Sequence, residues 1–146
     1  TVKDWWTAED AKNFEARAAV MANFFDSIEV APGVHANGEF TLGENIADHG
    51  GLQVSYQAFK KATAAAPLKI ENGFTPEQRF FLSYANVWAG NIRPEEILKR
   101  TKTDPHSLGK WRVDGALPQI GAWYEAFNIT EKDPMYLPVD KRVSIW

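Results

Sequence analysis

Cysteine is absent from the 146 residues, which excludes disulfide bonds and thiolate metal sites. Long apolar runs are also lacking, because no stretch approaches the roughly 20 residues that a membrane-spanning helix needs. No basic segment followed by an apolar one marks a signal peptide. The chain has no excess of positive charge either, since its net charge is -3. We therefore expect no membrane span in this segment and no nucleic-acid partner, and His, Asp and Glu remain as the metal ligands.

The residues that are present indicate a mainly helical single unit over 1–146. Hydrophobic residues make up 45% and charged residues 24%, which is typical of a folded domain. Apolar spacing and N-capping signals at Thr7 and Thr75 predict helices over about 8–28, 44–64, 76–89, 95–101 and 117–127. We expect a short extended piece at 39–42, no regular structure over 104–115, and a packed Trp146.

Glu44 and Asp48 stand out because they are one helical turn apart in "GENIADHGG". Two like charges at this spacing cost a few tenths of a kcal/mol, although the helix N-terminus partly offsets that cost. The adjacent Gly50 and Gly51 each cost about 1 kcal/mol in a helix, which indicates a closely packed face. Two interpretations remain: a solvated acidic pair, or acids that serve a cation. Since positions 40–51 hold no Arg or Lys, that cation comes from afar or is a metal ion.

His106 and Arg112 are the other candidates for chemistry. Asp104 precedes His106 by two residues and could hold the imidazole in its charged form, which suits stabilisation of an oxyanion. The alternative is an ordinary surface histidine. Arg112 lies between apolar neighbours, where an arginine often binds a carboxylate that is either structural or part of a ligand. We interpret His35 and His49 as structural or exposed.

Five strings in order resemble one family. They are "GENIADHGGL", "FTPEQRFFLSYANVWAG", "RPEEIL", "DPHSLGKWRVDGAL" and "RVSIW". Together they are similar to the C-terminal part of neprilysin-type (M13) zinc metallopeptidases, gluzincins that include neprilysin and endothelin-converting enzyme. The resemblance implies the C-terminal helical part of a thermolysin-like catalytic domain. Positions that carry disulfide cysteines in the animal enzymes are not cysteine here, which favours the bacterial branch.

The resemblance implies a zinc ion as cofactor. Glu44 matches the family's third protein ligand, and Asp48 matches the aspartate that holds a zinc-binding histidine and is often described as a proton donor. The other two ligands and the general base belong to an HExxH helix, and no HExxH occurs in these 146 residues. By the family's order, we expect that helix a few tens of residues before Thr1.

The resemblance also implies how a peptide is bound. His106 matches the histidine that stabilises the tetrahedral intermediate, and Arg112 the arginine that binds a substrate carbonyl or carboxylate. Val87 and Trp88 match the pair that lines the pocket for an apolar residue on the primed side. We therefore expect cleavage of oligopeptides on the amino side of apolar residues.

These expectations concern a longer parent protein. The 146 residues would need the N-terminal remainder of the same polypeptide as their partner, and alone they should be inactive. We expect a location outside the cytoplasm, periplasmic or lipoprotein-anchored, with a cytoplasmic location as the alternative. The rival function is a non-catalytic helical module that binds a peptide or carbohydrate on its aromatic surface.

Overall fold

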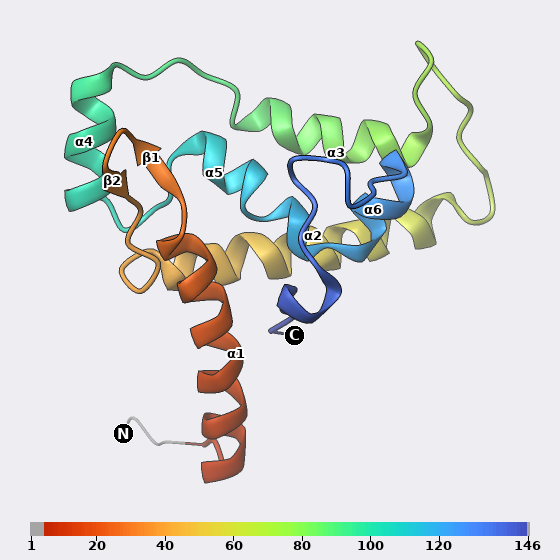
Figure 1. The fold of residues 1–146 in the computed structure, drawn as a ribbon. Coiled ribbons are helices and arrows are strands. Elements are labelled where there is room, and N and C mark those ends of the chain that lie inside the picture. The colour runs from red at the N-terminus through yellow and green to blue at the C-terminus, as the bar shows by residue number, and fades with distance from the viewer. Residues whose placement is uncertain (1–4, 146) are drawn as a thin grey trace.

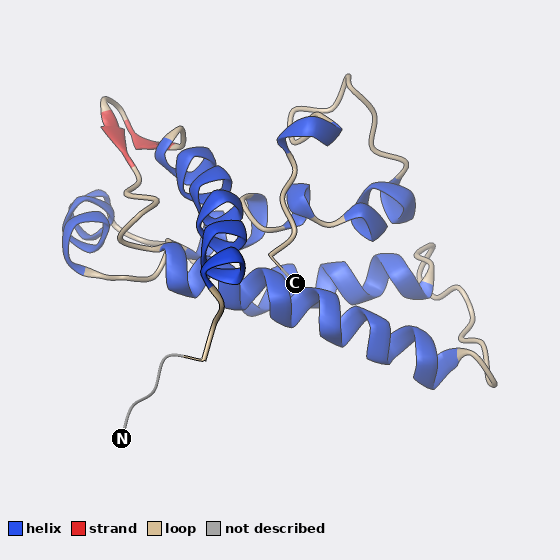
Figure 2. Ribbon diagram, turned by 90° about the horizontal axis from the view of Figure 1, so that it is seen from below, coloured by secondary structure: helices blue, strands red, loops and turns tan. Residues whose placement is uncertain are grey.

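The computed structural model describes residues 5–145 and is mainly helical. Figures 1 and 2 show α3 running alongside α2, and α1 projecting from the body of the molecule. None of the helices within the described residues combines the length and apolarity that crossing a bilayer requires. In chain order the elements are α1 (Ala8–Asp26), β1 (Glu29–Ala31), β2 (Val34–His35), α2 (Leu42–Thr63), α3 (Pro76–Val87), α4 (Pro94–Thr103), α5 (Gly109–Asp114), the 3-10 turn η1 (Leu117–Gln119), α6 (Gly121–Phe127) and the 3-10 turn η2 (Val139–Lys141).

The capping signals read from the sequence are confirmed. The Thr7 hydroxyl accepts a hydrogen bond from the Asp10 backbone N–H at 3.1 Å, and the Asp10 carboxylate accepts one from the Thr7 N–H at 3.0 Å. Thr75 and Gln78 form the same reciprocal pair at the start of α3. Both helices begin where these pairs satisfy backbone donors that have no partner within the helix.

Two predictions about the connections are wrong. Residues 38–41 form a turn, and the extended pieces lie earlier, in the antiparallel hairpin of β1 and β2. Gly33 permits that hairpin because its φ of 72° falls in the left-handed region. The segment 104–115 is also not irregular throughout, since α5 begins directly after Leu108. Its turn-forming residues precede the helix instead of interrupting it.

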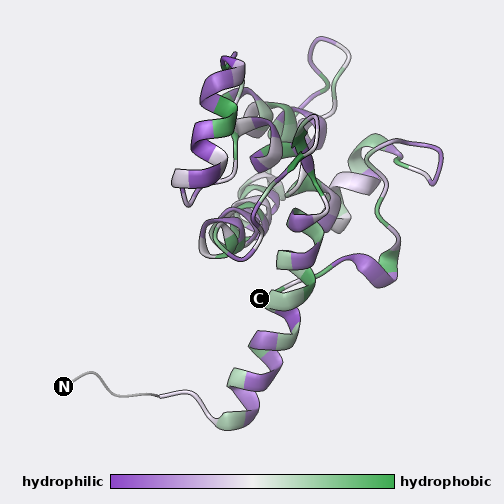
Figure 3. Ribbon diagram, turned by 60° about the vertical axis from the view of Figure 1, so that its left-hand side comes forward, coloured by the Kyte–Doolittle hydropathy of each residue, from purple (hydrophilic) through white to green (hydrophobic). Residues whose placement is uncertain are grey.

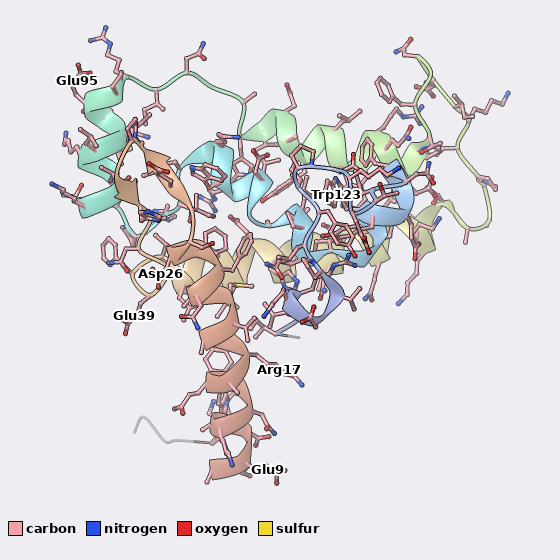
Figure 4. The ribbon with its side chains drawn as sticks, viewed as in Figure 1. Glu9, Arg17, Asp26, Glu39, Glu95 and Trp123 are labelled. Atoms are coloured by element: carbon pink, nitrogen blue, oxygen red, sulfur yellow. The ribbon has the colours of Figure 1, made fainter. Side chains whose placement is uncertain are left out.

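The last predicted helix is split in two, and the tail is partly ordered by side chains. η1 and α6 are separated by Ile120, whose extended backbone interrupts the helix. The Arg17 side chain, labelled in Figure 4, donates hydrogen bonds to the carbonyls of Ser144 and Ile145, at 3.5 and 3.2 Å. The prediction for Trp146 lies outside the described residues.

Two apolar clusters hold the helices together, and α2 belongs to both. Ile46 packs in the cluster that joins α1 to the C-terminal tail, and Leu52 packs in the one that joins α3 to α6. Figure 3 shows apolar and polar positions mixed along α1, with apolar ones present where it joins the body. The first turns of α2 are therefore fixed from both sides, which gives the polar residues on them a defined position.

Replacing Gly38 by alanine is expected to destabilise the protein by about 1–3 kcal/mol, the usual cost of overpacking. A β carbon at position 38 would overlap the Ala22 carbonyl of α1, and the Gly38 N–H also donates to the Asp26 carboxylate at 2.6 Å. The measurement is chemical denaturation of the natural protein that contains this chain. Gly121→Ala is the control, because nothing lies within 4 Å of a β carbon there. Equal stabilities for the two variants would contradict the close approach of residue 38 to α1.

Candidate active site

The acidic pair of α2 is split between two environments. The Glu44 side chain is 44% exposed, whereas that of Asp48 is only 12% exposed. Gly50 is buried within α2, but a β carbon at Gly51 would meet nothing within 4 Å. Close packing is thus found at the first glycine and not at the second within the described residues.

The cation that serves Asp48 comes from a distant part of the chain. Arg112 on α5 donates from Nε to Oδ2 and from Nη2 to Oδ1 of Asp48, both at 2.7 Å. This two-point bond raises the pKa of Arg112 further above its ordinary value. The guanidinium also stacks on the Trp88 ring, with its central carbon 3.8 Å from the ring centroid. The sequence left open whether the cation is a distant basic residue or a metal ion. At Asp48 it is a distant basic residue, Arg112.

Tyr84 fixes the same arginine through its backbone. The Tyr84 hydroxyl donates a hydrogen bond of 2.8 Å to the Arg112 carbonyl. Burial, together with the nearby Asp48 charge, raises the pKa of Tyr84 to about 12, so the hydroxyl keeps its proton and stays a donor at neutral pH. Sequence reasoning missed this contact because Tyr84 looks like one more apolar position on the α3 stripe.

His106 stands between two carboxylates. Its Nδ1 lies 2.7 Å from Oδ1 of Asp104, and the His106 backbone N–H donates to the same oxygen at 3.0 Å. These two hydrogen bonds lower the pKa of Asp104, and the bond from the backbone N–H has the larger effect. On the other side of the ring, Nε2 of His106 lies 3.4 Å from Oε2 of Glu44. The predicted partnership of His106 with Asp104 is therefore formed, and the loop brings His106 to Glu44.

His106 and Arg112 line a cleft of about 990 Å³, whereas their partners Glu44 and Asp48 lie behind this lining. Its walls come from β1, the end of α3, the connection from α3 to α4, α4 itself, the loop that leads into α5, and α5. The lining includes the expected site residues Val87, Trp88, Asp104, His106 and Arg112. Val87 is 69% exposed, which leaves an apolar surface free at the rim. The cleft is large enough to take several residues of a peptide.

Glu44 is suited to be one ligand of a metal site. Glu44 is a half-exposed carboxylate beside the cleft-lining His106, an oxygen donor of the kind that zinc accepts. Among residues 5–145, no three His, Asp or Glu side chains gather closely enough to hold a metal ion by themselves. Any zinc at Glu44 would need further ligands from other residues.

The two remaining histidines play no part in this cleft. His35 is exposed, and its Nδ1 lies 3.1 Å from the Asp26 carbonyl. His49 is fully buried, and burial lowers its pKa, so it is a neutral core residue. Both agree with the interpretation of these residues as structural or exposed.

Comparison with known proteins gives one consistent family. The profile described as Peptidase family M13 matches residues 1–143. Human neprilysin (Homo sapiens) is 36% identical over 148 residues, which cover 98% of this chain and 20% of neprilysin. Endothelin-converting enzyme 1 of Bos taurus is 35% identical over 137 residues, covering 92% of this chain and 18% of that enzyme. The chain thus spans about a fifth of the length of these relatives.

Solved structures agree in fold as well as in sequence. The zinc metalloprotease ZMP1 of Mycobacterium tuberculosis, in complex with an inhibitor, superposes with a TM-score of 0.94 at 33% identity, covering 100% of this chain and 23% of ZMP1. PEPO from Lactobacillus rhamnosis gives a TM-score of 0.81 at 34% identity, covering 100% of this chain and 22% of PEPO. Both of these proteins are bacterial, in line with the expected branch. The family match, the fold and the arrangement around the cleft lead to one conclusion: the chain belongs to peptidase family M13.

Proposed function

We propose that these residues form part of the active site of a zinc-dependent endopeptidase that hydrolyses oligopeptides. The observation that carries this proposal is the placement of Glu44 and His106 together beside the cleft that Arg112 lines. In such an enzyme Glu44 is one zinc ligand, and the others come from outside the 146 residues. The zinc ion, when bound, supplies Lewis-acid polarisation of the scissile carbonyl.

His106 is the residue of this chain that meets the developing negative charge. Nδ1 is held by Asp104, and Nε2 faces Glu44 at 3.4 Å. A protonated imidazole carries an N–H at Nε2, which can donate a hydrogen bond to an oxygen bound beside Glu44. Such a donor, fixed before the reaction begins, stabilises an oxyanion more than it stabilises the substrate carbonyl. We assign His106 this role, and Asp104 the role of orienting its ring.

Arg112 is suited to hold the peptide backbone next to the reacting bond. Asp48 takes up Nε and one hydrogen of Nη2, so both hydrogens of Nη1 and the second of Nη2 are left for a substrate carbonyl or carboxylate. We propose that Asp48 also accepts a hydrogen bond from a zinc-binding histidine, because each of its oxygens has a second lone pair. The ion pair then links substrate binding to the zinc site.

The apolar part of the cleft is suited to bind the substrate side chain that follows the scissile bond. Val87, Trp88, Ile92 and Ile97 all line it. We propose that an apolar side chain binds there, so that cleavage falls on its amino side. A mixture of oligopeptides incubated with the natural protein should yield products whose new N-termini are apolar, as read by mass spectrometry.

The test is hydrolysis of oligopeptides by the full natural polypeptide that contains this chain. We expect activity that is lost with a chelator and restored by zinc. The 146 residues alone should show none, because they supply one zinc ligand. A full-length protein that binds peptides or sugars but never cleaves them would support the rival binding module instead.

A further inference from the structure

A chain of hydrogen bonds joins the start of α2 to the loop that carries His106. The Ser107 hydroxyl donates to Oδ1 of Asn45 at 2.7 Å, and Nδ2 of Asn45 donates to the Thr41 hydroxyl at 3.0 Å. The Thr41 hydroxyl in turn donates to the Asn37 carbonyl at 2.9 Å. Asn45 and Thr41 are 3% and 5% exposed, so the central bond lies in the protein interior.

The direction of each bond explains why an asparagine stands at position 45. Thr41 gives its only hydroxyl hydrogen to Asn37, so it must receive one from its other neighbour. The Asn45 amide supplies that hydrogen from nitrogen and still offers its oxygen to Ser107. Aspartate has no N–H to give, and an apolar residue would leave both hydroxyls without this buried partner.

These hydrogen bonds fix the position of the loop that carries His106 relative to α2, as a comparison with the other polar contacts of the loop shows. His106 is held by Asp104, but Asp104 belongs to the same loop, so their bond cannot set the position of the loop relative to α2. The contact between His106 and Glu44 is 3.4 Å long and both side chains are 44% exposed, which makes it a weak restraint. The bond between Ser107 and Asn45 is shorter and better shielded from water.

The contact of Glu44 with His106 and the hydrogen bond of Asn45 with Ser107 are adjacent, both along α2 and along the loop before α5. Glu44 faces His106, and the residues that follow them, Asn45 and Ser107, are hydrogen-bonded. A bond one residue away from a catalytic contact fixes the separation of the two backbones at that contact. Displacement of a catalytic group by about 1 Å can cost as much as about 100-fold in rate.

We propose that Asn45 and Ser107 are positioning residues that hold His106 at a fixed distance from Glu44, and so from the reacting carbonyl. This inference rests on the proposed function and adds to it two residues that do not themselves touch the substrate. Their effect on catalysis passes through His106.

The test uses the full natural polypeptide. Ser107→Ala is expected to lower kcat by about 10-fold, the scale of one lost hydrogen bond and a partial displacement. KM and zinc content should stay close to those of the unaltered protein, and Tm should fall only slightly, because the buried Asn45 oxygen loses one donor. Ser107→Thr, which keeps the hydroxyl, should restore kcat, and Ser83→Ala, at an exposed serine of α3, is the matched control.

A double-substitution cycle separates positioning from a general effect on folding. In a His106→Gln background, Ser107→Ala should have no further effect on kcat, because the group that it positions is gone. Ser107→Ala should also weaken binding of a tetrahedral phosphonamidate peptide by about 10-fold, the same factor as its loss in kcat. A comparable loss in both backgrounds, or no loss in either, would overturn the inference while leaving the proposed function intact. A full-length protein with no zinc-dependent hydrolysis would instead overturn the proposed function, and this inference with it.

Discussion

Zinc is expected to be lost from the full-length protein when Glu44 is replaced by glutamine. A neutral amide cannot provide the charged oxygen ligand, and loss of an outer partner of a zinc ligand alone costs about 10–100-fold in metal affinity. We therefore expect zinc affinity to fall by more than about 100-fold, and peptide hydrolysis to fall with it. Metal content after dialysis against a weak chelator, measured by atomic absorption, gives the first quantity directly.

The matched control for this substitution is Glu95→Gln. Glu95 is also a glutamate in the first turn of a helix, but it is exposed on α4, whereas Glu44 lies 3.4 Å from the cleft-lining His106. Both substitutions remove one negative charge near a helix N-terminus, so their costs in stability should be similar. Equal zinc content in Glu44→Gln, Glu95→Gln and the unaltered protein would exclude Glu44 as a ligand.

Replacing His106 by glutamine should reduce kcat by about 100–1000-fold, the usual effect of removing one oxyanion donor. KM should change little, because the histidine acts mainly on the transition state. Zinc content should not change, since His106 is not assigned as a ligand. The measurement is steady-state kinetics of a single oligopeptide, with zinc content determined on the same samples.

His35→Gln is the control for the second substitution, because His35 is exposed and lies outside the cleft. A His106 variant in which KM rises while kcat is kept would argue against stabilisation of the transition state. It would indicate that His106 binds the substrate in its ground state.

The sequence predicts well those features that depend on neighbouring residues. Thr75 and Gln78 identify the start of α3 because both partners of the capping box lie within one turn. Asp104 and His106 form their predicted contact for the same reason, since two residues separate them. The starts of α1 and α3 were therefore predicted correctly, whereas α2 begins two residues before its predicted start, the last predicted helix is split into η1 and α6, and α5 was missed.

The sequence cannot predict contacts that depend on how distant segments pack. Arg112 and Asp48 are 64 positions apart, and Ser107 and Asn45 are 62 apart. The sequence indicates that Arg112 binds a carboxylate but not which one. Ser107 and Asn45 each have an acceptable role as a surface or capping residue when they are considered by themselves. Only the packing of the segment 104–114 against the start of α2 shows that they are partners.

The missed helix α5 has a similar explanation. The many turn-forming residues of 104–115 made the whole segment resemble a loop, yet no glycine or proline lies between Gly109 and Gly115. Trp111 and Val113 then pack against the two apolar clusters, one on each. Tertiary packing of these two side chains stabilises a helix of only six residues, which is too short to form on its own.

The central claim is that Glu44 coordinates the catalytic zinc of an M13 peptidase. The most direct measurement is anomalous diffraction at the zinc edge from crystals of the full-length protein. We predict a single strong peak with a Glu44 carboxylate oxygen at about 2.0–2.2 Å from the metal. A zinc ion bound without Glu44, or no peak beside the cleft in crystals of active enzyme, would contradict the claim.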